Sequence, residues 1–338
     1  MNLRFKLAAI LAGSLSISTN AVSGEELSVG TFVPPSHETI TGALAWFENE
    51  LTSRSNGELT LKVYAAGQLG AGPTQQYKRA VEGVADITFG IAASTPTLFP
   101  KTMLAILPGK ALDGPDSTRR MWTVFDKYMA DEWSDVKVLA VGNPAGGMII
   151  ATKDVSTIEG MKGTKIVPWA AITTPVLQGM GAVPVQLDPT EHYTALSTGT
   201  IDAAISSINN IMPPWNLDEV ANYAVVNTPA TFNPVFYVMN KERYESLSAK
   251  HQKIIDEISG MPFSMQLVQA FHDADEVALK WKDEKIAAGE LNVEWIVTSD
   301  RERAKMEAAA AAGMEAIYSD YADRGIQNAQ TIYEALNK

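Results

Sequence analysis

Short strand patterns alternate with helical patterns along the first half of the chain, and this alternation constrains the fold more than any single motif. "ELSVGTF" (26–32), "ELTLKVY" (58–64) and "ADITFG" (85–90) predict strands. The stretches at 37–55 and 73–84 between them predict helices, and Pro73 suits a first helical turn. This order predicts an open parallel sheet flanked by helices.

The middle of the chain repeats the strand and helix alternation with different residues. Strands are expected in "VKVLAVGN" (136–143), "GMIIAT" (147–152), "GTKIV" (163–167), "IDAAIS" (201–206) and "VFYVMN" (235–240). Beyond residue 242 the pattern is almost wholly helical, and 249–289 predicts one very long helix bent at Pro262. No flexible linker separates the halves, so we expect an α/β fold of the periplasmic-binding-protein type. It would have two α/β lobes around a ligand cleft and long C-terminal helices.

The first residues predict export. "MNLRFK" is basic, "LAAILAGSLSIS" is apolar, and "TNAVSG" offers small residues for cleavage after Ala21 or Ser23. The apolar run of roughly a dozen residues is shorter than a membrane span. We therefore expect a cleavable signal peptide (1–23), a periplasmic location and no direct membrane insertion. The expected lobes are 24–145 plus 235–275 for lobe I, and 146–234 plus 276–338 for lobe II.

Charge and cysteine content exclude several classes of protein. The chain has 27 basic and 39 acidic residues, and loss of Arg4 and Lys6 with the signal leaves a net charge near −14. Such a charge disfavours nucleic acid and anionic membranes as partners. With no cysteine, an exported chain has neither disulfides nor thiolate chemistry.

Few residues suggest catalysis or metal binding. His251 is expected on a solvated helix face and His192 in packing or capping. His272, Asp275 and Glu276 share one helix face, for which we expect an exposed acidic surface rather than a metal site. No nucleophile elbow, phosphate loop or zinc signature is present. We expect no enzyme activity, catalytic residue, cofactor or metal.

Aromatic and amide side chains gather at the predicted strand ends and turns. Small-molecule sites are mostly apolar walls with a few placed polar groups. His37 follows the first strand just before a helix N-terminus, where backbone donors face outward. The candidate ligand-binding residues are Phe32, His37, Gln75, Phe89, Asn143, Met148, Trp169, Asn209, Asn210, Trp215, Phe232 and Asn233.

Five stretches together resemble the DctP-type solute-binding proteins of TRAP (tripartite ATP-independent periplasmic) transporters. They are "SHETITGALAWFENEL" (36–51), "AAGQLGAGPTQQYKRAVEGVADITFG" (65–90), "MKGTKIVP" (161–168), "GMGAVPVQLDPTEHYTALSTGTIDAA" (179–204) and "FYVMNKERYESLSAKHQKIIDE" (236–257). They follow the family's order and cover essentially the whole chain after the signal. The resemblance implies a periplasmic receptor that closes on a small solute and delivers it to the TRAP membrane permease subunits.

The chain departs from the family at the strand "KIV". In most members an arginine follows the Lys165-Ile166 pair and binds the ligand's carboxylate, but here Val167 stands there. A second arginine of some members falls near Met148. The departure favours a neutral, aromatic or cationic solute held by aromatic side chains such as Trp169. The alternatives are an organic acid held without that arginine and, in a different class, an exported hydrolase or lyase; a structural or adhesive protein is disfavoured.

Overall fold

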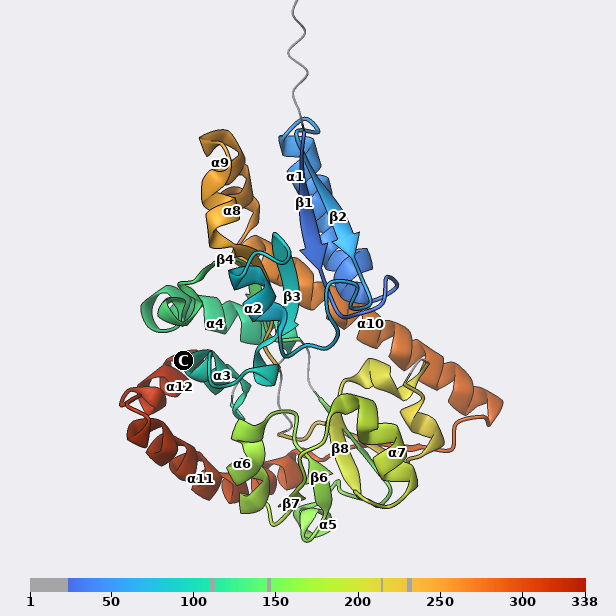
Figure 1. Cartoon of the computed structure of the whole chain (residues 1–338). Coiled ribbons are helices and arrows are strands. Elements are labelled where there is room, and N and C mark those ends of the chain that lie inside the picture. The colour runs from blue at the N-terminus through green and yellow to red at the C-terminus, as the bar shows by residue number, and fades with distance from the viewer. Residues whose placement is uncertain (1–23, 110–112, 145–146, 214, 230–232) are drawn as a thin grey trace, which may run out of the picture.

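The computed structural model describes residues 24–109, 113–144, 147–213, 215–229 and 233–338. The predicted signal peptide (1–23) lies outside the described residues. The described chain forms two separate sheets with helices around each of them (Figure 1). We call the five-stranded sheet and its helices lobe I, and the six-stranded sheet and its helices lobe II.

Lobe I is built on a mixed sheet with the order β2-β1-β3-β10-β4. Its strands are β1 (Glu25–Gly30), β2 (Leu59–Tyr64), β3 (Ile87–Ile91), β4 (Val136–Gly142) and β10 (Val235–Asn240). β1 pairs parallel with β2 and β3, but β10 runs antiparallel between β3 and β4. The expected wholly parallel sheet was therefore wrong, because a late strand that enters from the other lobe completes this sheet.

Lobe II has the strand order β11-β9-β5-β8-β6-β7. Its strands are β5 (Met148–Ala151), β6 (Lys165–Val167), β7 (Val183–Pro184), β8 (Ala203–Ser206), β9 (Tyr223–Val226) and β11 (Glu294–Val297). β5 runs antiparallel to both of its neighbours, so it begins at the edge where β8 and β9 end. The short strand β11 interrupts the C-terminal region that was expected to be almost wholly helical.

Lobe I takes helices from two separate parts of the chain, and the helices of lobe II lie mostly between them in the sequence. Around lobe I lie α1 (Ala45–Arg54), α2 (Gln76–Val81), α3 (Pro100–Met103), α4 (Gly114–Tyr128), α8 (Lys241–Ser246) and α9 (Ala249–Ile258). Around lobe II lie α5 (Ile158–Met161), α6 (Thr174–Gly179), α7 (His192–Ser197) and the first part of α11 (Asp300–Asp323). A π-helical segment η1 (Thr39–Leu44) precedes α1.

The long helix α10 (Met261–Ala288) joins the two hydrophobic cores. Phe263 and Leu267 pack in the lobe I core, and Ala278 packs in the lobe II core. α10 does not continue α9, so the single bent helix expected over 249–289 was wrong. Gly260 between them has a φ of +71°, which a helix interior does not allow. Pro262 then stands in the first turn of α10, where its missing N–H costs little.

The C-terminal helices return to lobe I. α11 packs on α6, and α12 (Ala329–Leu336) lies against α4. The hydroxyl of Tyr321 donates to the Pro100 carbonyl oxygen at 2.8 Å, and that of Tyr333 donates to the Pro108 carbonyl oxygen. In Figure 1 this arc of helices runs from α6 to α3 along one side of the molecule. The expected lobe boundaries at 145, 234 and 275 stay a prediction.

Candidate ligand-binding site between the two sheets

The chain passes from one sheet to the other after β4 and returns before β10, and the described residues of these crossing segments are 143–144, 147, 227–229 and 233–234. In lobe I, β4 ends at Gly142 and β10 begins at Val235, and these two residues are paired. In lobe II, β5 begins at Met148, which pairs with Ser206 at the end of β8. The carboxyl-terminal ends of β1, β3 and β4 therefore face the carboxyl-terminal ends of β6, β8 and β9. Such strand ends are where α/β proteins bind ligands.

Aromatic rings gather at the lobe I edge. Phe32 follows β1 and stacks on Phe89 of β3, with ring centroids 5.8 Å apart. The ring of His37 lies 6.4 Å from Phe89 and 6.1 Å from Phe271 of α10. Burial lowers the pKa of His37, and the nearby Glu38 opposes that shift only in part. The imidazole is therefore neutral at physiological pH and forms part of an aromatic wall.

Asn209 connects this edge to lobe II. It lies in the turn η7 (Ile208–Ile211) after β8, and its backbone N–H donates to Asp275 Oδ1 of α10 at 3.2 Å. Its side-chain Nδ2 donates to Glu38 Oε1 of lobe I at 3.3 Å. Burial raises the pKa of Asp275 to about 7, and the negative charges of Glu38 and Glu276 add to this shift. Asn209 thus holds two carboxylates from different parts of the fold.

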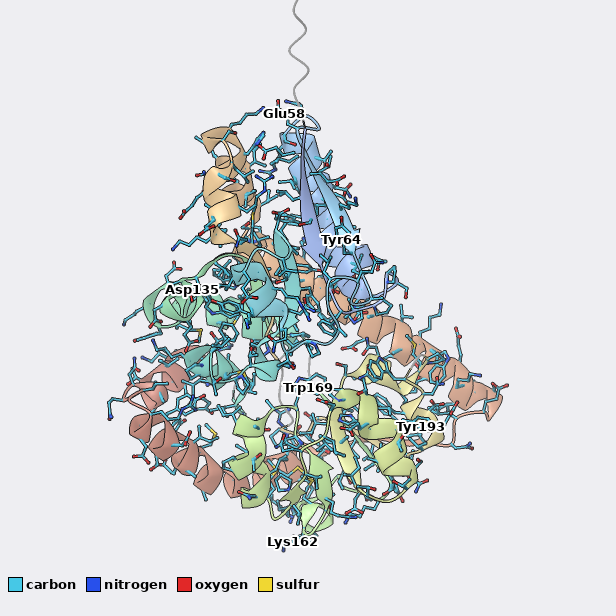
Figure 2. The ribbon with its side chains drawn as sticks, in the orientation of Figure 1. Glu58, Tyr64, Asp135, Lys162, Trp169 and Tyr193 are labelled. Atoms are coloured by element: carbon cyan, nitrogen blue, oxygen red, sulfur yellow. The ribbon has the colours of Figure 1, made fainter. Side chains whose placement is uncertain are left out.

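The lobe II edge is apolar apart from one indole and a few small polar groups. Met148 and Val167 are buried. Trp169 lies two residues beyond β6 and appears between the two lobes in Figure 2. Its Nε1 is buried without a hydrogen-bond partner among the described residues. Asn210 donates through Nδ2 to Ser206 Oγ at 2.9 Å, which fixes this amide beside the end of β8.

Asn143 and Asn233 lie on the crossing segments. Asn143 is fully buried, and its Nδ2 donates to Ser117 Oγ at 2.8 Å and to the Ala105 carbonyl oxygen at 3.4 Å. Its Oδ1 has no partner among the described residues, nor does the Oδ1 of the buried Asn233. Because buried polar atoms in native proteins are nearly always paired, such atoms at a strand edge point to an external partner.

Two of the predicted site residues lie on the surface of the protein. Gln75 is exposed just before α2, and Trp215 keeps 40% of its surface exposed. Phe232 lies outside the described residues.

Three residues of the arrangement were missed by the sequence analysis: Glu38, Phe271 and Asp275. The expected exposed acidic face was wrong for Asp275, because only 7% of its surface is exposed. Its spacing could have revealed this, since Asp275 stands four residues after Phe271 and three before the buried Ala278. His251 was also expected on a solvated face, but it is buried between carboxylates far from these edges.

The edge residues named above include carboxylates and amides but no arginine or lysine. Arg79 of α2 reaches the loop after β2, where its Nη2 donates to the Ala71 carbonyl oxygen at 3.2 Å and its Nη1 is buried without a partner among the described residues. Met148 and Val167 stand at the positions where the family resemblance implies arginines in other members, and both side chains are apolar and buried. In the part of the chain that the structure describes, no group of three or more histidine, aspartate or glutamate side chains could hold a metal ion.

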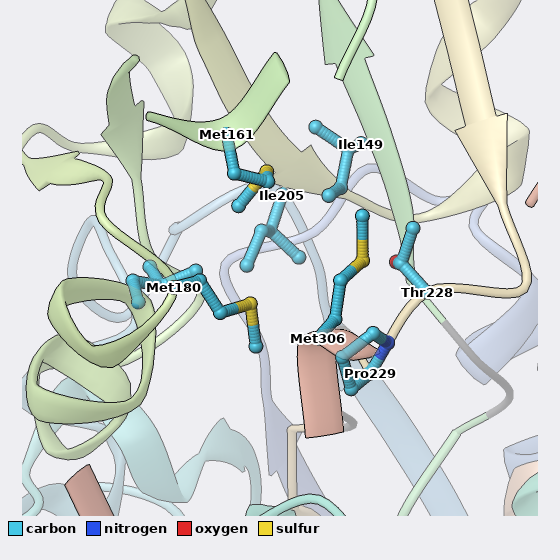
Figure 3. A pocket seen from close by; sticks show the side chains of 8 residues that line it. Ile149, Met161, Met180, Ile205, Thr228, Pro229 and Met306 are labelled. Carbon is cyan, nitrogen blue, oxygen red and sulfur yellow. The ribbon is translucent and has the colours of Figure 1, made fainter. Parts of the chain in front are cut away.

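A separate small pocket lies inside lobe II (Figure 3). Its lining is almost wholly apolar and includes none of the predicted site residues. The lining residues are Ile149, Met161, Leu177, Met180, Ile205, Thr228, Pro229 and Met306. It lies between the sheet and α5, α6 and α11, and Thr228 and Pro229, which follow β9, also line it. None of the described helices is both long and apolar enough to span a bilayer.

Comparison with known proteins identifies the class of protein. The family model "DctP: Bacterial extracellular solute-binding protein, family 7" matches residues 29–320. The chain belongs to this family, the DctP-type solute-binding proteins of TRAP transporters. The family and the similar structures are substrate-binding receptors rather than enzymes.

Individual relatives resemble the chain over nearly its whole length. It is 25% identical to "Outer membrane transporter protein TsaT" of Comamonas testosteroni, covering 99% of this chain and 98% of that protein. A marine metagenome TRAP solute binding protein specific for aromatic acid ligands superposes with a TM-score of 0.82 at 26% identity, covering 92% and 97% of the two chains. A TRAP solute binding protein from Rhodoferax ferrireducens T118, in complex with benzoate, gives a TM-score of 0.81 at 25% identity, with coverage of 93% and 96%.

Proposed function

We propose that this protein is the periplasmic substrate-binding subunit of a TRAP transporter, exported through a signal peptide (1–23). It captures a small aromatic solute between the facing strand ends and delivers it to the membrane permease subunits. The observation that carries the proposal is the combination at these edges of aromatic rings and buried, unpartnered polar atoms.

The aromatic character of the solute follows from the walls. Phe32 and Trp169, both partly exposed, supply rings at the two facing edges. Phe89, which is 1% exposed, supports Phe32 from the lobe I core, and the buried Met148 belongs to the lobe II core. Aromatic pairs contribute about 0.5–1.5 kcal/mol beyond the area they bury. A planar ring held from both lobes would therefore favour the closed arrangement over an open one.

The proposed charge of the solute rests on the apolar Met148 and Val167 and on the two carboxyl groups of Glu38 and Asp275. A carboxylate buried there would face Glu38 and Asp275 without an arginine, and burial of an unpaired charge is costly. The neutral His37 offers little compensation. A neutral or cationic aromatic solute avoids both costs.

A second candidate is an aromatic acid. It is favoured by the marine metagenome and Rhodoferax proteins, whose solved complexes hold metahydroxyphenylacetate and benzoate. Such a ligand would depend on backbone donors at the strand ends and on the indole N–H of Trp169. An exported hydrolase or lyase remains the alternative from another class, and turnover of a bound compound would be its signature.

Binding would shift the equilibrium between open and closed arrangements of the lobes. The middle of α10 joins the two cores and is a place where the backbone would bend. A solute that touches both edges binds the closed arrangement better, which the permease would recognise.

Calorimetric titration with benzylamine, benzyl alcohol and benzoate tests the proposal. The three share a ring and differ in charge, so we expect the amine or the alcohol to bind at least about tenfold more tightly than benzoate. Tighter binding of benzoate would overturn the charge assignment and support the second candidate. Recovery of chemically altered compound would instead support an enzyme.

A further inference from the structure

The orientation of the Asn209 side chain is fixed by its neighbours. The amide Nδ2 faces Glu38 Oε1 at 3.3 Å, and an ionised carboxylate can only accept a hydrogen bond. Rotating the amide by 180° would place two acceptors against each other. The position of the turn is fixed as well, because the backbone N–H of Asn209 donates to Asp275 Oδ1.

This orientation leaves Asn209 Oδ1 as an acceptor without a donor. The atom is buried, and no group among the described residues donates to it. A buried acceptor that lacks a partner is destabilising, and native proteins rarely keep one without a functional reason. Glu38 orients the side-chain amide and Asp275 anchors the backbone N–H of the same residue, so turning the amide over would break the bond to Glu38 without gaining a donor for Oδ1.

Asn143 shows the same arrangement at the opposite edge. Its Nδ2 faces the carbonyl oxygen of Ala105, which accepts only, and its Oδ1 is buried and unpartnered. Two amides in different lobes are thus fixed with their oxygens free. Among the described residues, the candidate site therefore has more unpaired hydrogen-bond acceptors than unpaired donors.

We propose that Asn209 Oδ1 accepts a hydrogen bond from the solute, so that the solute carries a hydroxyl or amino donor on its aromatic skeleton. The inference rests on the proposed function, because it takes an aromatic solute as given. Glu38 and Asp275 are positioning residues, since they orient Asn209 and need not touch the solute. A solute lacking a donor would leave the acceptor buried and unpaired, which is how a polar site rejects such analogues.

Two pairs of probe compounds test the effect of the solute's hydrogen-bond donor separately from the effect of its charge. One pair is 3-hydroxyphenethylamine and 3-methoxyphenethylamine, and the other is 3-hydroxyphenylacetate and 3-methoxyphenylacetate. Each pair keeps the charge and exchanges a donor for a methyl ether, and phenethylamine and phenylacetate control for the size of the methyl group. In the pair that binds, we expect the hydroxyl compound to bind at least about tenfold more tightly than both of its analogues.

Variants assign the effect to Asn209. Asn209→Leu should reduce the preference for the hydroxyl compound to about twofold or less, because the fixed acceptor is gone. Glu38→Gln should reduce it partly, since an amide partner lets Asn209 turn over. Asn222→Leu, at the opposite end of the lobe II sheet, is the matched control and should keep the full preference.

The outcomes distinguish this inference from the proposed function. Equal affinity for hydroxyl and methoxy compounds in the unmodified protein, or a preference that survives Asn209→Leu, would overturn the inference alone. Tighter binding of the acid pair would overturn only the charge assignment. Binding of none of the probes would remove the aromatic solute and the inference with it. If Asn209→Leu does not fold, Glu38→Gln and the preference of the unmodified protein still decide.

Discussion

Two clusters of polar side chains at opposite ends of lobe I differ in how their charged and polar groups are paired. At the end far from lobe II, near Glu58 in Figure 2, Glu58 and Glu25 have basic neighbours. Glu58 Oε2 lies 2.8 Å from Lys250 Nζ and 2.9 Å from His251 Nε2. Arg243 Nη2 lies 2.9 Å from Glu25 Oε2 at the start of β1. These charges pair with one another and tie the first strand to α8 and α9, and His251 Nδ1, 3.4 Å from Glu25 Oε1, is the one atom of these side chains described without a hydrogen-bond partner.

At the edge that faces lobe II, the polar groups are not satisfied in this way. Among the described residues, neither Glu38 nor Asp275 has an arginine or lysine partner, and the neighbouring base His37 is kept neutral by burial. Trp169 Nε1 and Asn209 Oδ1 lack partners altogether. The paired charges of the far cluster stabilise the fold, and the proposed function assigns the unpaired polar atoms of the interlobe edge to contact with a solute.

The largest expected effect concerns Trp169. Trp169→Ala should weaken binding of the best aromatic probe by about 100-fold, or about 3 kcal/mol, because a ring wall and a donor are both lost. Trp169→Phe keeps the ring and should cost about tenfold. Calorimetric titration measures both.

The matched control is Trp122→Phe. The Trp122 indole N–H already donates to the Val141 carbonyl oxygen at 2.9 Å. Its loss should lower the melting temperature and leave the affinity unchanged. An affinity loss in Trp122→Phe equal to that in Trp169→Phe would erase the distinction between partnered and unpartnered indoles.

The next effect concerns the buried carboxyl of Asp275. Its pKa of about 7 lies above the ordinary value of 3.8, so the folded protein disfavours the ionised form. The resulting cost to stability grows as the pH rises from about 4 and is complete above about 7. Asp275→Asn removes this cost and should raise the free energy of unfolding by about 2 kcal/mol at pH 8, and by little at pH 4.

Chemical denaturation at the two pH values measures this change. Asp273→Asn is the control, because Asp273 is exposed on the same helix and should show no such pH dependence. If Asp275→Asn is destabilising at pH 8, the carboxylate has a favourable partner and the interlobe edge resembles the far cluster after all.

A smaller effect is expected from Arg243. Its guanidinium joins Glu25 to Asp86, and Asp86 Oδ2 in turn accepts from the backbone N–H of Ser28 at 2.7 Å. Arg243→Met should destabilise the protein by about 1 kcal/mol in denaturation, because two carboxylates lose their shared cation. Affinity for the aromatic probe should stay the same. A weakened affinity would contradict the assignment of this cluster to stability alone.

The smallest effect is expected from Glu58. Hydrogen bonds from Lys250 and His251 lower the pKa of Glu58 below its usual 4.5. A lowered acid pKa stabilises the fold above the ordinary value and loses that contribution as the pH falls through the folded pKa. Glu58→Gln should therefore lower the melting temperature slightly at pH 7 and not near pH 3. The exposed Glu245→Gln is the control, and an equal shift at both pH values would show that charge is not the cause.

Much of the fold could be predicted from local patterns. The strands β1, β2, β3, β4 and β10 appear where period-two and apolar runs placed them, because each run carries its own signal. The pairing could not be predicted in the same way. β10 enters lobe I antiparallel between two earlier strands, and the intervening residues build a second sheet.

The candidate site likewise contains some residues that could be predicted from the sequence and others that could not. Phe32, Phe89 and Trp169 could be proposed as site residues because strand ends are visible in the sequence, and their contact with a solute stays a prediction. Asp275 could not, since a carboxylate in a charged helix is ordinarily exposed, and its burial depends on lobe II covering α10.

The sequence by itself determined most of the strands, the family, and the apolar residues at 148 and 167 where the resemblance implies arginines in other members. These depend on neighbouring residues and on composition. Only the tertiary structure decided that Glu38, Asn209 and Asp275 meet, and that Trp169 and Asn209 keep unpartnered atoms. The physical reason is that hydrogen bonds between residues more than sixty positions apart exist only after the chain has crossed between its two sheets, and no local pattern records them.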